Sequence, residues 1–84
     1  MKRTILGIHV ANRVTTVQQL QQIYTNYGCN IKTRIGLHQV SDQMCSPAGL
    51  HILEMYGDDD QIREMERQLS SLDGVEVKKM VFNE

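Results

Sequence analysis

The order of the hydrophobic patterns constrains this chain more than any single motif. Four segments alternate apolar and polar residues with the period of two that is typical of strands, namely 4–10, 30–38, 48–56 and 75–82. Two further segments, 16–27 and 58–72, repeat apolar residues at the three- and four-residue spacing of a helix. The predicted order is therefore strand, helix, strand, strand, helix, strand.

Two βαβ halves of this kind interlock readily. Right-handed crossovers make the strands of each half parallel with a gap between them, and a strand of the other half fills that gap. We therefore predict an α+β fold, a ferredoxin-like βαββαβ sandwich with a four-stranded antiparallel sheet of order 4-1-3-2 and both helices on one face. The 84 residues are predicted to form a single domain, 1–84, at the small end of independent folding.

Residues at the ends of the two predicted helices match known capping signals. Thr16 followed by Gln19 matches a capping box, and Gly28 lies where a left-handed C-terminal cap is expected. Asp58-Asp59-Asp60 places a cap and negative charge at the start of the second helix. Asp73-Gly74 is expected to end it.

Charge and composition argue against several functions. The net charge is -1 and the basic residues are scattered, so the chain has no electrostatic footprint for direct nucleic-acid binding. No run approaches the roughly 20 apolar residues of a membrane span, so we expect a cytoplasmic protein. The two cysteines, Cys29 and Cys45, are predicted to lie about 20 Å apart, which is beyond the roughly 7 Å limit for a disulfide. Both are expected to be free thiols.

The sequence lacks the motifs of well-known protein families that have this topology. Two cysteines cannot bind an iron–sulfur cluster that needs four, and aromatic residues are too few on the open face for an RNA-recognition motif. No phosphate loop or paired nucleophile and base is found in the sequence. We therefore expect a protein that is not an enzyme and needs no cofactor.

The helix-free face of the sheet is the strongest functional signal. Strand 48–56 is apolar on both faces, and such a strand is normally covered on both. With both helices on one face, a second subunit is the expected cover, which predicts a homo-oligomer, a dimer or a tetramer. The predicted interface residues are Ile5, Gly7, His9, Arg34, Leu50, Ile52 and Glu54. Arg34 and Glu54 are expected to share this face and to form an ion pair between subunits, while Thr33 and Ile35 should face the helices.

Histidine and cysteine side chains raise the alternative of metal sensing. His9, His38, Cys45 and His51 are suitable ligands for zinc, nickel or copper. Their spacing matches no compact metal motif, and a single histidine on a strand is more often packed or hydrogen-bonded. A metal-sensing module that uses His38 and Cys45, with His9 or His51, stays open beside the interpretation of these residues as packed histidines and inert thiols.

Two sets of residues resemble known families. Val10-Ala11-Asn12-Arg13, the helix that follows, and Tyr27-Gly28-Cys29-Asn30-Ile31 resemble the pattern of ACT domains, which are regulatory modules that typically bind amino acids at subunit interfaces. The stretch 34–54, through Arg34-Ile35-Gly36-Leu37-His38, Cys45-Ser46-Pro47 and Gly49-Leu50-His51, is similar to the small ACT-like iron-only hydrogenase system regulators. These are related in fold to the C-terminal domain of nickel-responsive regulators. The resemblance implies a regulatory or ligand-sensing domain, with a role in transcription or in a hydrogenase system.

The polar segment 39–47 is longer than an ordinary hairpin loop. Pro47 restricts the backbone of Ser46, so we expect an ordered loop, packed on a neighbouring subunit, that brings Cys45 close to Arg34 and His38. Ligand-binding candidates for a small anion or polar metabolite are Arg34, His38, Cys45 and Ser46, with Asn12 and Arg13 as a separate site at the first turn. The alternatives are a solvated tether and, for the whole protein, a structural interaction domain without a ligand.

Overall fold

The computed structural model describes residues 2–11, 14–40 and 45–84, without the side chains of 14–15, 37–40 and 45–48. Its elements, in chain order, are β1 (Lys2–Val10), α1 (Val14–Asn26), the short 3-10 helix η1 (Gly28–Asn30), β2 (Ile31–Val40), β3 (Cys45–Met55), α2 (Asp59–Ser70) and β4 (Val75–Asn83). None of the described helices has both the length and the hydrophobicity of a transmembrane segment.

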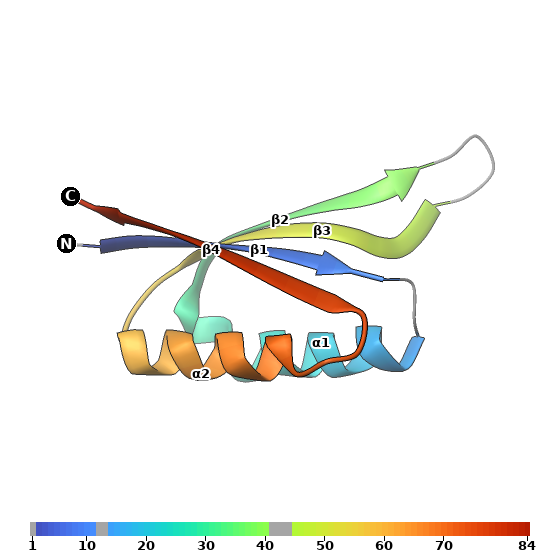
Figure 1. Ribbon diagram of the computed structural model, residues 1–84, viewed down its shortest axis with the longest axis horizontal. Coiled ribbons are helices and arrows are strands. Elements are labelled where there is room, and N and C mark those ends of the chain that lie inside the picture. The colour runs from blue at the N-terminus through green and yellow to red at the C-terminus, as the bar shows by residue number, and fades with distance from the viewer. Residues whose placement is uncertain (1, 12–13, 41–44) are drawn as a thin grey trace.

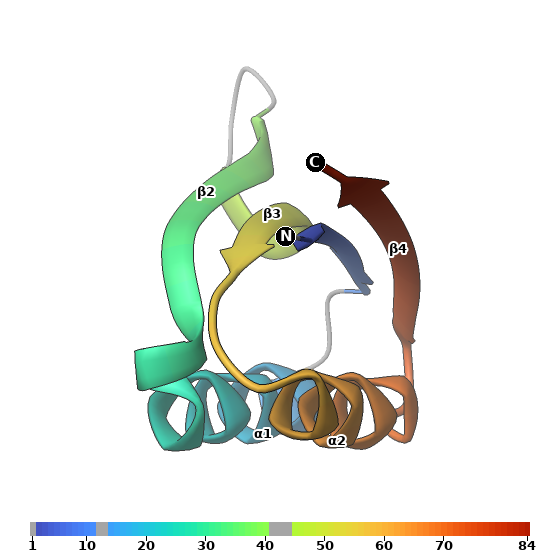
Figure 2. The same ribbon diagram turned by 90° about the vertical axis from the view of Figure 1, so that its left-hand side faces the viewer.

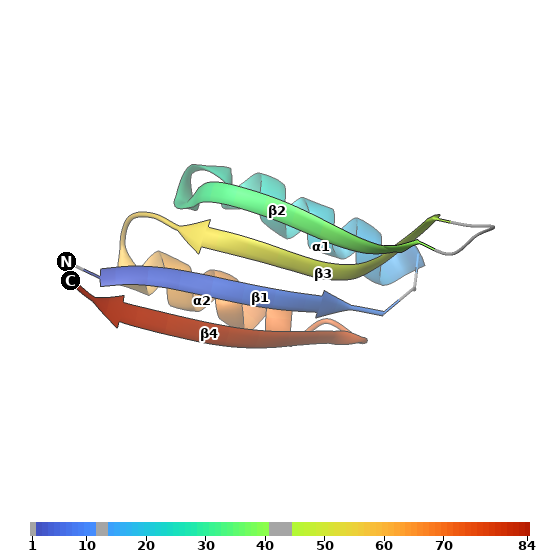
Figure 3. The same ribbon diagram turned by 90° about the horizontal axis from the view of Figure 1, so that it is seen from above.

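The strands form one antiparallel sheet and the helices form one layer beneath it. The strand order is β2-β3-β1-β4, with β3 and β1 in the centre (Figure 3). Both helices pack under the same face of the sheet, and the opposite face has no helix on it (Figures 1 and 2). The predicted ferredoxin-like fold, its strand order and its helix placement are confirmed.

The core lies between the sheet and the helices. Leu6 and Ile8 of β1 and Leu53 of β3 are fully buried from the sheet side, as are Met65 and Leu69 of α2 from below. Burial of each such aliphatic side chain contributes about 1.5–3 kcal/mol. The predicted inward faces of β1 and β3 are therefore confirmed.

Helix α2 begins as its acidic start predicts. Asp58 has extended backbone angles, and its carboxylate accepts a hydrogen bond from the backbone N–H of Asp60 at 2.8 Å. After the helix ends at Ser70, Gly74 adopts a φ of 79° at the turn into β4.

Both capping predictions for the first helix are wrong. Helix α1 begins at Val14, two residues before Thr16, and the Thr16 hydroxyl donates to the carbonyl of Asp73 at 2.7 Å. This bond ties α1 to the α2–β4 connection, so the hydroxyl does not cap its own helix. Gly28 does not have a positive φ, because the chain continues from α1 into the 3-10 turn η1.

A β-bulge at the start of β2 overturns the predicted faces of that strand. Ile31 pairs with Met55 and Thr33 pairs with the next residue of β3, Glu54. Lys32 is therefore an extra residue of β2 that has no partner of its own on β3. A one-residue insertion moves every later side chain to the other face. Thr33 and Ile35 therefore lie on the helix-free face, and Arg34 lies on the helix side.

The segment 39–47 is not the long loop that its polar content predicts. Strand β2 extends to Val40 and β3 begins at Cys45, and these two residues pair across the hairpin. The connection is thus limited to 41–44, a usual length for a hairpin.

Cys29 lies in η1, just before the start of β2, and is an exposed free thiol.

A glycine pair offers a test of the β3–α2 connection. Gly57 has a φ of 101°, and a Cβ placed there would lie 3.0 Å from Nδ2 of Asn30. Gly57→Ala should lower the free energy of unfolding by about 1–3 kcal/mol, because a positive φ is unfavourable for a residue that has a Cβ atom. Gly28→Ala is the control, since nothing lies within 4 Å of its Cβ position, and it should be neutral or slightly stabilising. Urea denaturation of both variants at one protein concentration measures the difference; equal stabilities would contradict it.

Candidate functional site

The helix-free face of the sheet carries a continuous set of apolar side chains. Ile35 of β2 pairs with Ile52 of β3, which in turn lies opposite Gly7 of β1. One step along, Ile5 lies between Glu54 and Met80. Ile35 is 50% exposed and Met80 is 53% exposed, although both are large apolar residues.

Most of the predicted interface residues lie on this face, as the register places them. Those that do are Ile5, Gly7, His9, Leu50, Ile52 and Glu54. Among the residues whose side chains are described, the large apolar members of the face that were missed are Ile35, because of the bulge, and Met80 and Phe82, which lie on the edge strand β4. Their signal in the sequence was the apolar run Met80-Val81-Phe82, in which both faces of a strand are hydrophobic.

Arg34 lies on the other side of the sheet, so the expected pair with Glu54 is wrong. Its guanidinium lies 4.6 Å from the centre of the Tyr24 ring of α1, a cation–π distance. The Glu54 carboxylate instead accepts from the Thr33 hydroxyl at 3.0 Å. The bulge at Lys32 is the cause, because it exchanges the faces of Thr33 and Arg34.

Beneath the sheet, Arg34 joins a small polar cluster with Tyr24 and His51. The Tyr24 hydroxyl lies 2.8 Å from Nδ1 of His51, and the ring centres are 5.6 Å apart. Burial raises the pKa of the Tyr24 hydroxyl, and the positive charge of Arg34 offsets part of that rise. Burial lowers the pKa of His51, and Arg34 lowers it further. Tyr24 is therefore the donor and the imidazole is neutral at pH 7, with its proton on Nε2.

The two histidines whose side chains are described, His9 and His51, lie on opposite faces of the sheet. His9 pairs with Leu50 on the helix-free face, whereas His51 faces the helices and bonds to Tyr24. One protomer therefore cannot offer both to the same ion. Among the described residues, no three His, Cys, Asp or Glu side chains form a group that could hold a metal.

The remaining predicted ligand-binding residues are located only in part. Asn12 and Arg13 lie outside the described residues. Within the backbone pairing of β2 and β3, His38 lies opposite Gly49 and Cys45 lies opposite Val40. Ser46 follows in β3. Whether these residues line a pocket stays a prediction.

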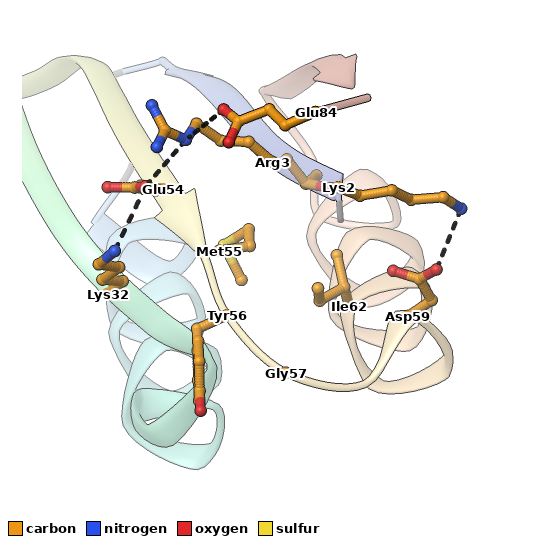
Figure 4. A pocket seen from close by; sticks show the side chains of 11 residues that line it. Lys2, Arg3, Lys32, Glu54, Met55, Tyr56, Gly57, Asp59, Ile62 and Glu84 are labelled. Carbon is orange, nitrogen blue, oxygen red and sulfur yellow. Dashed lines mark hydrogen bonds and ion pairs between the residues drawn. The ribbon is translucent and has the colours of Figure 1, made fainter. Parts of the chain in front are cut away.

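A hollow of about 640 Å³ lies at the opposite end of the sheet, near the two chain ends (Figure 4). Its apolar part includes Met55 of β3 and Ile62 of α2, which are almost fully buried. Tyr56, 65% exposed, is also part of its lining. Beyond the basic pair Lys2-Arg3, no sequence pattern indicates this hollow, because its residues come from β1, β2, β3, α2, the β3–α2 connection and the C-terminal end.

Ion pairs span the charged side of the hollow (Figure 4). Arg3 lies between two carboxylates, with Nε 3.7 Å from Glu54 and 3.3 Å from Glu84. Lys32, the bulge residue, reaches the same Glu54 at 3.9 Å. Lys2 lies 3.2 Å from Asp59 in the first turn of α2. The lining thus carries three cations and three carboxylates.

Known structures share this arrangement of strands and helices. An uncharacterized protein from Thermotoga maritima is 25% identical, with a TM-score of 0.81 over 99% of this chain and 100% of that one. The ACT domain of a GTP pyrophosphokinase from Chlorobium tepidum is 14% identical, with a TM-score of 0.60 over 95% and 97% of the two chains. The chain has an ACT-like fold.

More distant matches add the fold alone. A formyltetrahydrofolate deformylase from Pseudomonas putida is 8% identical, with a TM-score of 0.51 over 95% of this chain and 28% of the enzyme. Comparison with protein-family models and with curated proteins gives no match.

The contact between Arg34 and His51 can be tested by titration. Arg34→Gln should raise the pKa of His51, because it removes a positive charge that disfavours the imidazolium. NMR titration of the imidazole Cε1 proton measures this. Lys78→Gln removes the same charge from the helix-free face and should leave the His51 titration unchanged. An unchanged titration in Arg34→Gln would contradict the contact.

The lowered pKa of His51 predicts that the stability of the protein depends on pH. The folded pKa of His51 lies below its ordinary value of 6.5, so the unfolded state binds this proton more readily. This contribution to stability is therefore complete well above pH 6.5 and is lost as the pH falls from there through the folded pKa. Tm measurements across that range should show a smaller decline for His51→Gln than for the wild type.

Proposed function

We propose that the chain is a non-enzymatic regulatory or ligand-sensing ACT-like domain that acts as a homo-oligomer in the cytoplasm. The observation that carries the proposal is the helix-free face of the sheet, where Ile35 and Met80 are exposed in the isolated chain and Ile52 is partly exposed. Contiguous apolar surface of this kind commonly marks an interface. The sequence similarity of 34–54 to iron-only hydrogenase system regulators supports a role in controlling such a system or its transcription.

A second copy of the chain fits this face better than a charged partner does. Its centre is formed by Ile5, Ile35 and Ile52 with Gly7 beside them, and Glu54, opposite Ile5, is the charged residue that borders this group on β3. Gly7 leaves room for a side chain from the other copy. Charged residues lie around it, among them Glu76 and Lys78 of β4, as in the polar rim of a typical interface. Two such faces are self-complementary under a twofold axis.

The regulatory ligand is proposed to bind where copies meet. In this proposal Arg34, His38, Cys45 and Ser46 form one small site for an anion or polar metabolite, and Asn12 and Arg13 form another at the first turn. What supports the first is the hairpin register, which brings Cys45 beside the end of β2 that carries His38. Arg34 lies farther from the hairpin along β2, on the helix side of the sheet, with its guanidinium over the ring of Tyr24.

Ile52→Glu tests the interface. The substitution introduces a carboxylate at the centre of the helix-free face, where association would desolvate it. We expect the oligomer to weaken by at least about 2 kcal/mol, or about thirtyfold in Kd. Sedimentation velocity over a range of concentrations measures the change, and circular dichroism verifies that the variant folds.

Gln21→Glu is the matched control, because it adds the same charge at an exposed position of α1. It should leave the oligomer intact. A wild type that stays monomeric at high concentration would contradict the proposed assembly, as would an Ile52→Glu variant that associates as tightly as the wild type.

Thiol reactivity tests the proposed ligand site. Cys29 is exposed and provides an internal reference for a freely reacting thiol. In variants that keep only one cysteine, we expect Cys45 to react more slowly than Cys29, because a neighbouring copy would cover it. Hydrogen exchange should show protected amides in segment 39–46. Equal labelling rates together with unprotected amides would leave no enclosed site there.

A further inference from the structure

We propose that the hollow at the start of β1 is a binding site for a small anion with an apolar body. This site is separate from the proposed ligand site, because it lies at the opposite end of β1 from the turn that contains Asn12 and Arg13. The lining described here comes from a single copy.

The hollow has the size and the mixed lining of a small-molecule site. Its volume of about 640 Å³ lies within the usual range for ligand pockets. Met55 and Ile62 supply an apolar surface, and Tyr56 also belongs to the lining, although its ring points away from them in Figure 4. Figure 4 shows the ion pairs of Arg3 along the sheet, whereas the Lys2–Asp59 pair joins β1 to the start of α2. A ligand can therefore meet apolar and charged groups at once.

The cations of the hollow have unused hydrogen-bonding capacity. The ion-pair distances of Arg3 to Glu54 and Glu84 are those of Nε, at 3.7 and 3.3 Å, and within the described residues its two terminal amino groups make no hydrogen bond. Such a guanidinium fork matches a carboxylate or a phosphate. Lys2 is more than half exposed and holds Asp59 by one contact at 3.2 Å. Exposed pairs of this type are weak, so both cations can turn towards a ligand.

The carboxylates, by contrast, favour neither a cationic ligand nor a polyphosphate. Glu54 already accepts from Thr33 and lies in range of Arg3 and Lys32. Asp59 lies in the first turn of α2, where the helix dipole stabilises it. Because the three cations are balanced by three carboxylates, the hollow has no excess positive charge, and an anionic group can bind only where it replaces a carboxylate at Arg3 or Lys2, whereas a chain of phosphates would also meet Glu54 or Asp59. The ligand is therefore expected to carry a single anionic group.

A buried hydroxyl without a partner points to the same place. Thr4 lines the hollow and is only 7% exposed. Within the described residues the Thr4 hydroxyl makes no hydrogen bond. Among these same residues, every side-chain oxygen or nitrogen that is fully buried has a hydrogen-bond partner, so the Thr4 hydroxyl is not one of the fully buried atoms. The Thr4 hydroxyl must therefore reach solvent. Since Thr4 lines the hollow, we take that opening to be the hollow itself. A polar atom with so little access to water is available to bond to a ligand.

One wall of the hollow is fixed in place before any ligand binds. The side chain of Asn30, buried beneath the β3–α2 connection, donates to the carbonyl of Tyr56 at 3.1 Å and to Gln61 at 3.0 Å. The Asn30 carbonyl accepts from the backbone N–H of Tyr56 at 2.7 Å. These bonds hold the segment Tyr56-Gly57 that lines the hollow. A preformed wall reduces the ordering cost of binding.

Titration of the whole chain with three aromatic probes tests the proposal. The probes are phenylacetate, phenyl phosphate and the uncharged benzyl alcohol, followed by two-dimensional amide NMR. At least one anion should cause saturable shifts at residues 2–4 and 54–59, and benzyl alcohol should bind about tenfold more weakly. Tighter binding of phenylacetate indicates a carboxylate ligand, and tighter binding of phenyl phosphate indicates a phosphate monoester.

Variants separate a built site from non-specific adsorption. Arg3→Gln should weaken binding of the preferred anion about tenfold. Thr4→Val, which keeps the shape of the side chain, should weaken it about threefold. Lys78→Gln removes an equal charge from the helix-free face and should change nothing. Tm measurements confirm that each variant folds.

Three results would overturn the proposal. The first is the absence of saturable shifts with either anion. The second is binding of benzyl alcohol as tight as that of the anions. The third is a set of shifts that centres on Ile35, Ile52 and Lys78 rather than on residues 2–4 and 54–59, or that is equally sensitive to Lys78→Gln and Arg3→Gln.

Discussion

Packing of two helices against one face of the sheet is the interaction on which the rest of the structure depends. Leu6, Ile8 and Leu53 have no exposed surface because α1 and α2 cover them. With these elements used, the opposite face has no cover from the described chain, and Ile35 there keeps half of its surface in contact with solvent. In a chain of 84 residues the core is small, so burial of that second face would add considerably to stability.

The bulge at Lys32 decides what each face of the sheet can do. It places Ile35 beside Ile52, which makes the helix-free face more apolar at its centre. It also places Arg34 over the ring of Tyr24. Without the extra residue, Arg34 would lie in the centre of the helix-free face and Ile35 would lie beside His51. One inserted residue therefore separates an apolar surface above the sheet from a polar cluster below it.

The parts of the fold that follow from local chemistry could be predicted from the sequence. Alternation in β1 and β3 identifies their buried faces, and Glu54 indicates which face of β3 is turned away from the helices. Asp58 caps α2 because a carboxylate before a helix satisfies free N–H groups. The bulge could not be predicted, because residues 31–37 alternate regularly and the extra residue is visible only in the pairing with β3.

The hollow could not be predicted for a different reason. Its lining comes from the beginnings of β1 and β2, the end of β3 and the first turns of α2, and no sequence pattern relates these positions. The role of Asn30 is equally hidden, since a strand residue and a buried anchor for Tyr56 look the same in sequence. Such contacts follow from the assembled topology.

Glu54 connects the hollow with the helix-free face. Its neighbours Ile5 and Thr33 lie on that face, whereas its counter-charges Arg3 and Lys32 line the hollow. An anion that draws Arg3 away leaves the Glu54 carboxylate less well compensated, and burial of that carboxylate against a second copy then costs more free energy. Under both proposals, binding in the hollow and association through the face oppose each other, and thermodynamic linkage requires that association weaken the binding of the anion by the same factor. A single partly buried carboxylate is thus sufficient to connect a ligand at one end of the sheet with the assembly of the domain.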